Sequence, residues 1–180
     1  IAEAKVLSAY FYLDLISFWG DVPIVTKEIE KTEFKNYPRK PKAEAYTLIE
    51  KDLTEAIAVL PTKADYAAGD KFRVSKGTAQ ALLGKAHLYQ KEWAQAATQL
   101  DAVINSGAYK LVPTISAVFD KTGEFGDESI LEASHTASEK YNWNNYPWGR
   151  NLENNLILQL MGPRGEGYRK APTDTLIAGW

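Results

Sequence analysis

Apolar residues recur at helical spacing in four separate segments, and this pattern limits the possible folds more than any other feature of the chain. An apolar residue at every third or fourth position forms one face of a helix, which another element must cover. The spacing predicts helices over residues 2–19, 43–60, 75–91 and 93–106. We therefore expect a mainly all-α fold in which helices pack on helices.

The first predicted helix is apolar on almost every side, which is typical of a helix in the middle of a stack rather than at a surface. Gly20 fits the left-handed residue that often follows a helix. The residues after it predict a turn and then a short extended stretch over residues 24–26. The apolar residues of this helix are Val6, Leu7, Tyr10, Phe11, Leu13, Leu15, Ile16, Phe18 and Trp19.

The other three helices are expected to bury one face each. Ser75 is placed to cap the third helix, because a serine hydroxyl can accept from the free backbone N–H groups of the first turn. Only a break at Lys91-Glu92 separates the third and fourth helices, so they should be antiparallel neighbours. The expected buried positions are Tyr46, Ile49, Leu53, Ala56, Ile57 and Leu60 in the second helix, Ala79, Leu82, Leu83, Ala86 and Tyr89 in the third, and Trp93, Ala96, Ala97, Leu100, Val103 and Ile104 in the fourth.

The third and fourth helices match the spacing of a tetratricopeptide repeat. Leu83-Gly84 take the Leu-Gly positions, Ala96 follows twelve residues after Gly84, and Leu100 follows four residues after Ala96. Small residues at Gly84 and Ala96 would let the two helices approach closely, and Leu100 would fill the groove between them. His87 departs from the pattern, which prefers tyrosine at that position.

The character of the sequence changes after residue 110. Residues 1–110 carry the helical periodicity and form the predicted scaffold of tetratricopeptide-like helical hairpins, whereas residues 111–180 form a long irregular insertion of the same domain. An irregular stretch well above about 15 residues is uncommon in a compact domain unless it is functional or disordered. Within it we expect a helical turn at residues 115–119 and a strand at residues 130–134.

Aromatic and amide residues concentrate between residues 141 and 151. A sugar ring presents apolar C–H faces and a rim of hydroxyl groups, so its recognition needs flat aromatic surfaces beside amide or guanidinium groups. The same aromatics could instead pin the segment onto the helical scaffold, and the sequence leaves both interpretations open. The candidate ligand-binding residues are Tyr141, Asn142, Trp143, Asn145, Tyr146, Trp148 and Arg150.

The composition argues against several other classes of protein. With 21 Lys and Arg against 23 Asp and Glu, the formal net charge is −2, and no basic surplus exists to bind nucleic acid. The chain has no cysteine and two histidines, His87 and His135, so we expect neither a metal site nor a cofactor. The acidic stretch at residues 120–128 lacks calcium-loop spacing and is expected to be a solvated loop.

Several groups of residues form motifs in a fixed order. They are Glu3-Ala4-Lys5, Ala9-Tyr10-Phe11-Tyr12 and Phe18-Trp19-Gly20-Asp21-Val22-Pro23-Ile24-Val25, then Ile49-Glu50-Lys51-Asp52-Leu53-Thr54-Glu55-Ala56 with Leu60-Pro61, then Ser75-Lys76-Gly77-Thr78-Ala79-Gln80-Ala81-Leu82-Leu83-Gly84-Lys85, and later Ala171-Pro172-Thr173-Asp174. In order and spacing these motifs resemble those of the SusD/RagB family of outer-membrane nutrient-binding lipoproteins. No residue in them is catalytic.

The resemblance implies a SusD-like α-α superhelix that binds glycans or oligosaccharides without catalysis. It implies a position on the outer face of the outer membrane, held by a lipid anchor, and delivery of the glycan to a SusC-like TonB-dependent transporter. It also implies that the 180 residues are an internal fragment of a longer protein, with the anchor before Ile1.

Two other functions stay open on the sequence alone. The helix pair by itself is also typical of a tetratricopeptide-type scaffold for protein–protein interaction. A glycoside-acting enzyme would need two carboxylates in one cleft, about 5 to 9.5 Å apart, and the sequence singles out no such pair. We therefore predict a glycan-binding protein that is not an enzyme, with the protein-binding scaffold as the alternative.

Overall fold

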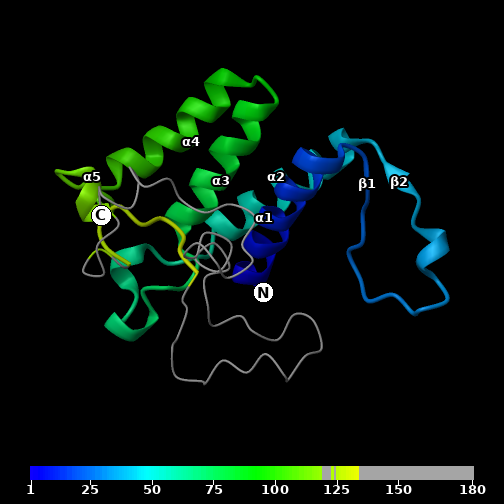
Figure 1. Ribbon diagram of the computed structural model, residues 1–180, viewed down its shortest axis with the longest axis horizontal. Helices are drawn as coiled ribbons and strands as arrows, with labels where there is room; N and C mark the ends of the chain where they lie inside the picture. The colour runs from blue at the N-terminus through cyan, green and yellow to red at the C-terminus, as the bar shows by residue number, and fades with distance from the viewer. Residues whose placement is uncertain (119–122, 124, 134–180) are drawn as a thin grey trace, which may run out of the picture. The chain divides into compact units, whose positions relative to one another are not determined.

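The computed structural model describes residues 1–118, 123 and 125–133. The chain forms two compact units, residues 1–132 and 133–180, so nearly all the described residues belong to the first unit. Within this unit α1, α2, α3 and α4 lie side by side (Figure 1), which confirms the predicted mainly helical fold. These helices span Ala2–Trp19, Lys42–Ile57, Lys76–Tyr89 and Trp93–Asn105.

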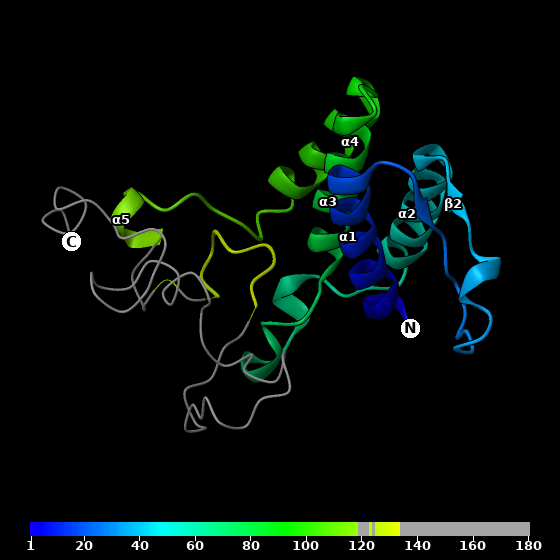
Figure 2. The same ribbon diagram turned by 45° about the vertical axis from the view of Figure 1, so that its right-hand side comes forward.

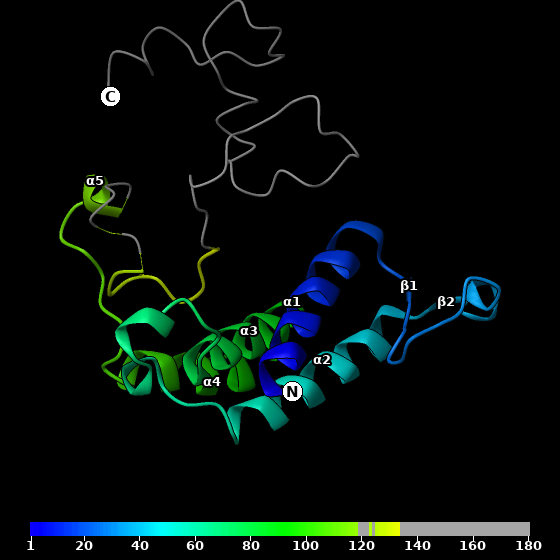
Figure 3. The same cartoon turned by 90° about the horizontal axis from the view of Figure 1, so that it is seen from below.

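The remaining elements are short. They are β1 (Val22–Pro23), β2 (Arg39–Lys40), α5 (Ile115–Val118) and three 3-10 turns, η1 (Phe34–Asn36), η2 (Lys63–Asp65) and η3 (Ala68–Asp70). β1 and β2 pair antiparallel, with Val22 opposite Lys40 and Pro23 opposite Arg39. This pair lies beyond one end of α1 and α2, whereas η2 and η3 lie toward the other end (Figure 3). α5 confirms the helical turn expected at residues 115–119 as far as residue 118.

The core of the first unit forms where α1, α2 and α3 meet. α1 contacts both α2 and α3, which also contact each other, and Figure 2 shows α1 beside both. Leu13, Ile49 and Leu53 are almost fully buried, and each contributes about 1.5–3 kcal/mol by leaving water. The buried helical residues of the core are Val6, Ala9, Leu13 and Ile16 on α1, Ala45, Tyr46, Ile49, Leu53 and Ala56 on α2, and Ala79, Leu83 and Ala86 on α3.

Asp21 and Arg39 fix the path of the chain from α1 to α2. The Arg39 guanidinium donates to the carbonyl oxygens of Trp19 and Asp21, each at 2.7 Å, and a cation is favourable at this carboxyl end of α1. The Asp21 carboxylate accepts from the backbone N–H of Lys42 at 3.0 Å. Because helices begin with unpaired N–H groups, this contact stabilises the first turn of α2.

α3 and α4 form an antiparallel hairpin that depends on a small residue at their closest approach. A Cβ atom at Gly84 would lie 2.7 Å from Cδ2 of Leu100 and 3.5 Å from the carbonyl oxygen of Ala96. Residue 84 before the turn thus meets residues 96 and 100 after it, which confirms the predicted antiparallel direction. Leu83 and Ala96 are buried and Leu100 is half-buried, as this contact requires.

The prediction of which α4 residues are buried is partly wrong. Ala96 and Val103 are buried, but Ala97 is exposed, as are Trp93 (62% exposed) and Ile104 (70% exposed). In the described part of the chain α4 packs mainly against α3, so only a narrow stripe of the helix is covered. Tyr89, at the end of α3, is exposed for the same reason, and its burial was also wrongly predicted.

The expectation that α1 lies in the middle of a stack is also wrong for the described residues. One face of α1 packs against α2 and α3, whereas Leu7, Phe11, Leu15 and Phe18 form an exposed apolar stripe along the helix. Phe18 is 78% exposed. None of the described helices combines the length and the apolar character that a membrane crossing requires.

Two expectations about extended structure need correction. The strand predicted at residues 130–134 does not form over residues 130–133, where the backbone is irregular. The carbonyl oxygen of Ile130 accepts from the side chain of Thr78 instead of from a neighbouring strand. The regular strand after α1 is Val22–Pro23, two residues before the stretch expected at residues 24–26.

Enlarging Ala96 should overpack the α3–α4 contact, because its position faces Gly84 across the hairpin. We expect Ala96→Leu to lower the free energy of unfolding by about 1–3 kcal/mol. Ala97→Leu is the matched control, since Ala97 is exposed on the same helix and its replacement should change stability by less than about 0.5 kcal/mol. Denaturant melts of both variants measure the difference. Equal stability of the two would contradict the hairpin contact.

Candidate functional site

The residues predicted to bind glycan lie outside the described residues. They are Tyr141, Asn142, Trp143, Asn145, Tyr146, Trp148 and Arg150. The structure does describe the segment that leads toward them, residues 125–133, and the part of the helical scaffold that holds this segment. The structure also defines the contacts of residues 125–133 and the other polar clusters of the described residues.

The beginning of α3 is a dense hydrogen-bonded cluster around Ser75, the residue that caps the helix. The Ser75 hydroxyl accepts from the backbone N–H of Thr78 at 3.4 Å, and the Thr78 hydroxyl accepts from the backbone N–H of Ser75 at 3.3 Å. This reciprocal pair confirms the predicted cap and satisfies two backbone donors of the helix start. Both residues are buried, so an unpaired polar group there would be costly.

Gly77 makes room for Tyr109 beside this cap. A Cβ atom at Gly77 would lie 2.5 Å from the Tyr109 hydroxyl oxygen, so a side chain there would force the Tyr109 ring to move. Tyr109 uses this space to place its hydroxyl 2.9 Å from that of Ser75. The residue pattern Ser75-Lys76-Gly77-Thr78 thus has a physical explanation, because each of its three small residues takes part in one cluster.

The segment at residues 125–133 is tied to the same cluster by side chains that bind its backbone. The Thr78 hydroxyl donates to the Ile130 carbonyl oxygen at 2.8 Å. The Lys63 ammonium donates to the carbonyl oxygens of Gly126 and Ser129, at 2.6 and 2.8 Å. It also lies 5.4 Å from the centre of the Tyr109 ring, within the range of a cation–π contact. Burial lowers the pKa of Lys63, while the nearby Asp127 carboxylate acts in the opposite direction.

Two acidic residues of this segment, Glu128 and Glu132, have structural partners. One carboxylate oxygen of Glu128 accepts from the backbone N–H of Val112 at 2.9 Å. One oxygen of Glu132 accepts from the Phe125 N–H and the Ser129 hydroxyl, both at 2.9 Å. Glu128 is therefore engaged with the backbone and is only half-buried. Asp120 and Glu124 of the predicted acidic loop lie outside the described residues.

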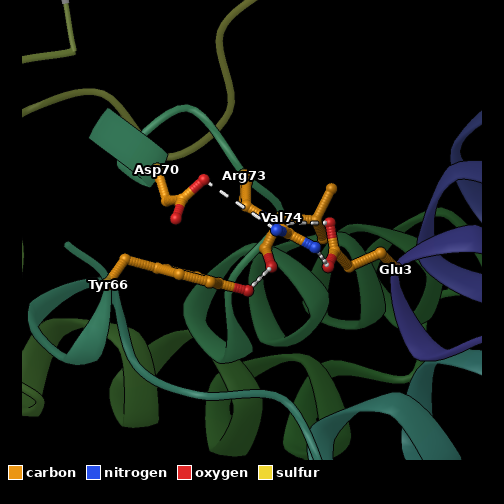
Figure 4. Close-up of polar contacts among 5 residues, drawn as sticks. All are labelled: Glu3, Tyr66, Asp70, Arg73 and Val74. Carbon is orange, nitrogen blue, oxygen red and sulfur yellow. Dashed lines mark hydrogen bonds and ion pairs between the residues drawn. The ribbon is translucent and has the colours of Figure 1, made fainter. Parts of the chain in front are cut away.

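The loop before α3 is held onto α1 by an ion pair between Arg73 and Glu3. The guanidinium reaches both carboxylate oxygens, with Nη2 to Oε1 at 2.5 Å and Nε to Oε2 at 3.3 Å (Figure 4). Nη1 of Arg73 also lies 3.9 Å from Asp70. The Tyr66 hydroxyl donates to the Val74 carbonyl oxygen at 2.9 Å, next to the cap of α3. These contacts fix the loop from which Lys63 extends.

A second polar cluster brings together residues that the sequence did not connect. Glu50 on α2, His87 on α3 and Glu92 at the start of α4 each place one donor atom within 4.8 Å of the others. Nδ1 of His87 lies 2.6 Å from Oε2 of Glu92. His87 and Glu92 are five residues apart across the α3–α4 turn, whereas Glu50 is distant in sequence, and no local motif signals that it joins them.

The described part of the chain is thus a helical stack with an irregular segment anchored to the start of α3. The family described as "Starch-binding associating with outer membrane" matches residues 1–88, which include α1, α2 and most of α3. Residues 1–88 of the chain are thus similar to this SusD-like family, in agreement with the resemblance of the sequence motifs.

Individual relatives agree with this assignment. The chain is 25% identical over 130 residues to SusD-like protein P25 of Formosa agariphila. A solved "Laminarin binding SusD-like protein" is 36% identical over 91% of this chain, with a TM-score of 0.82. Surface glycan-binding protein A from Bacteroides thetaiotaomicron, solved in complex with laminarihexaose, is 26% identical over 72% of this chain, with a TM-score of 0.61. The chain covers 24%, 36% and 27% of these three proteins, respectively.

The cluster at the start of α3 predicts that a side chain at Gly77 destabilises the fold. We expect Gly77→Ala to lower the free energy of unfolding by about 1–3 kcal/mol, because the methyl group takes the place of Tyr109. Gly69→Ala is the control, since a Cβ atom there has no neighbour within 4 Å. Adding Tyr109→Leu to Gly77→Ala should cost less than the sum of the two single changes. Full additivity in thermal melts would contradict the contact.

Proposed function

We propose that the protein binds glycans at the cell surface and delivers them to a SusC-like TonB-dependent transporter in the outer membrane. In this proposal the full protein is attached to the outer face of that membrane by a lipid anchor. The helices of the first unit act as a tetratricopeptide-like scaffold, and residues 141–151 form the glycan-binding segment. The protein takes up its ligand without chemical change and is not an enzyme.

The observation that carries the proposal is the likeness to the laminarin-binding SusD-like protein. It covers 91% of the chain at 36% sequence identity. A second similar structure is a surface glycan-binding protein with laminarihexaose bound. Laminarin and laminarihexaose are therefore the first ligands to test on this protein.

The residue types of the aromatic segment support the same function. Trp143 and Trp148 offer large rigid faces for the apolar side of a sugar ring. Asn142 and Asn145 can both donate to and accept from hydroxyl groups. Contacts of this kind desolvate little area, so we expect weak binding. A millimolar dissociation constant corresponds to only about −4 kcal/mol, which one or two stacked rings can supply.

The alternative function is a tetratricopeptide-type scaffold that binds another protein. The exposed apolar stripe on α1 and the exposed Trp93 on α4 are the described features that favour it. The alternative predicts that Trp93 matters more for ligand binding than Trp143 or Trp148. It also predicts a peptide or protein ligand and no response to glycans.

Replacing Trp143 or Trp148 by Ala in the intact protein should weaken glycan binding by about 1–3 kcal/mol, because a stacked ring and its buried area are lost. Replacing Asn142 or Asn145 should cost about 1 kcal/mol, the net worth of a neutral hydrogen bond. Titration calorimetry with laminarin and laminarihexaose measures these changes. The thermal stability of each variant should stay that of the wild type.

Trp93→Ala is the matched control, since it removes an exposed tryptophan of α4 and should leave glycan binding unchanged. If Trp143→Ala and Trp148→Ala each lose about 3–5 kcal/mol of stability, and no effect on glycan binding can be separated from unfolding, the aromatics anchor the segment instead. Wild-type binding by both variants would place the glycan site elsewhere. Steady release of reducing ends from a glycan panel would overturn the non-enzymatic assignment.

A further inference from the structure

The cluster of Glu50, His87 and Glu92 joins three helices of the scaffold. Glu50 belongs to α2, His87 to α3, and Glu92 is the residue just before α4. One ligand atom from each lies within 4.8 Å of the other two, and all three residues are half-buried. The His87 side chain is 12% exposed and that of Glu92 is 38% exposed, so the site is sheltered yet open to solvent.

Hydrogen bonds already hold these side chains close to one another. The backbone N–H of Glu92 donates to the His87 carbonyl oxygen at 2.9 Å, so the turn between α3 and α4 fixes the two residues as a pair. Their side chains meet again, with Nδ1 of His87 at 2.6 Å from Oε2 of Glu92. The Gln90 amide donates to Oε1 of Glu50 at 2.5 Å and directs that carboxylate toward the same turn. A ligand here would therefore immobilise few additional groups.

The charges of the cluster favour a cation. Two carboxylates lie near one imidazole, and among the described residues neither Glu50 nor Glu92 forms an ion pair with lysine or arginine. With neutral His87 the three side chains carry a formal charge of about −2, which a divalent cation would neutralise. Like charges in a half-buried site repel each other until such a cation, or a proton, is bound.

The donor atoms indicate which cation. Imidazole nitrogen together with carboxylate oxygen suits zinc and related transition metals, whereas calcium and magnesium prefer sites made of oxygen alone. Zinc bonds of about 2.0–2.2 Å in a tetrahedron place neighbouring donors roughly 3.3–3.6 Å apart. The observed separations, from 2.6 Å to at most 4.8 Å, lie on both sides of this range and need only small side-chain movements.

We propose that Glu50, His87 and Glu92 form a zinc-type site for a divalent transition metal that ties α2 to the α3–α4 hairpin. His87 binds through Nδ1, with its proton on Nε2, and exchanges its hydrogen bond to Glu92 for a bond to the metal. Water completes the coordination. The role is structural, and it is independent of glycan binding by residues 141–151.

Zinc binding to the intact protein, stripped of metal with a chelator, tests the site. Calorimetry should show that the wild-type protein binds one zinc ion per chain and that His87→Gln does not bind it. Thermal melts of the wild type should show a rise in Tm with zinc, because the metal binds only the folded state. Glu50→Gln should weaken zinc binding roughly tenfold or more. Co²⁺ in place of zinc should give the visible absorption of a low-coordinate nitrogen–oxygen site, and this absorption should disappear in His87→Gln.

The other histidine supplies the matched control. His135→Gln keeps one histidine in the chain and should bind zinc and Co²⁺ like the wild type, and Glu44→Gln removes an exposed carboxylate of α2 with the same result. Zinc binding that survives both His87→Gln and Glu50→Gln would overturn the proposal. Loss of the metal in His135→Gln, or no binding by the wild-type protein, would overturn it as well. Glycan affinity should be the same in all of these variants as in the wild type.

Discussion

The capped start of α3 is the contact on which the rest of the first unit depends. Ser75 and Thr78 satisfy each other's backbone donors, and the same turn receives Tyr109 above Gly77 and Ile130 at the hydroxyl of Thr78. One turn of helix therefore positions stretches of chain that are more than 30 residues apart in sequence. This convergence explains how one helix start built from Ser75, Gly77 and Thr78 can organise a segment that has no regular structure of its own.

The irregular segment after α5 illustrates how backbone polar groups are satisfied without a sheet. Carbonyl oxygens of residues 125–133 accept from Lys63 and Thr78, while the carboxylates of Glu128 and Glu132 accept from backbone N–H groups. Buried backbone groups need partners, and here side chains provide them. The geometry of such a segment consequently depends on a few long side chains rather than on a repeating ladder.

Periodicity predicted the helices and the core well, because burial of one face repeats regularly along each helix. It failed at Trp93 and Ile104, since a pattern identifies apolar residues but not the neighbours that cover them. The cap at Ser75 was predictable from residue type and position. Contacts between residues distant in sequence, such as Gly77 with Tyr109, carry no local signal and needed the structure. The glycan-binding role of residues 141–151 stays a prediction from residue types.

The close contact of Gly84 with Leu100 has a consequence for how related chains can diverge in length. Each residue added inside an α-helix rotates the following part by about 100°, so one insertion within α4 before Ala96 would turn Ala96 away from Gly84 and bring a larger neighbour into the gap. The chain between β1 and β2 does not set the rotation of one helix against another, and lengthening this loop costs little conformational entropy. Insertions and deletions should therefore accumulate between the strands and be rare within α3 and α4.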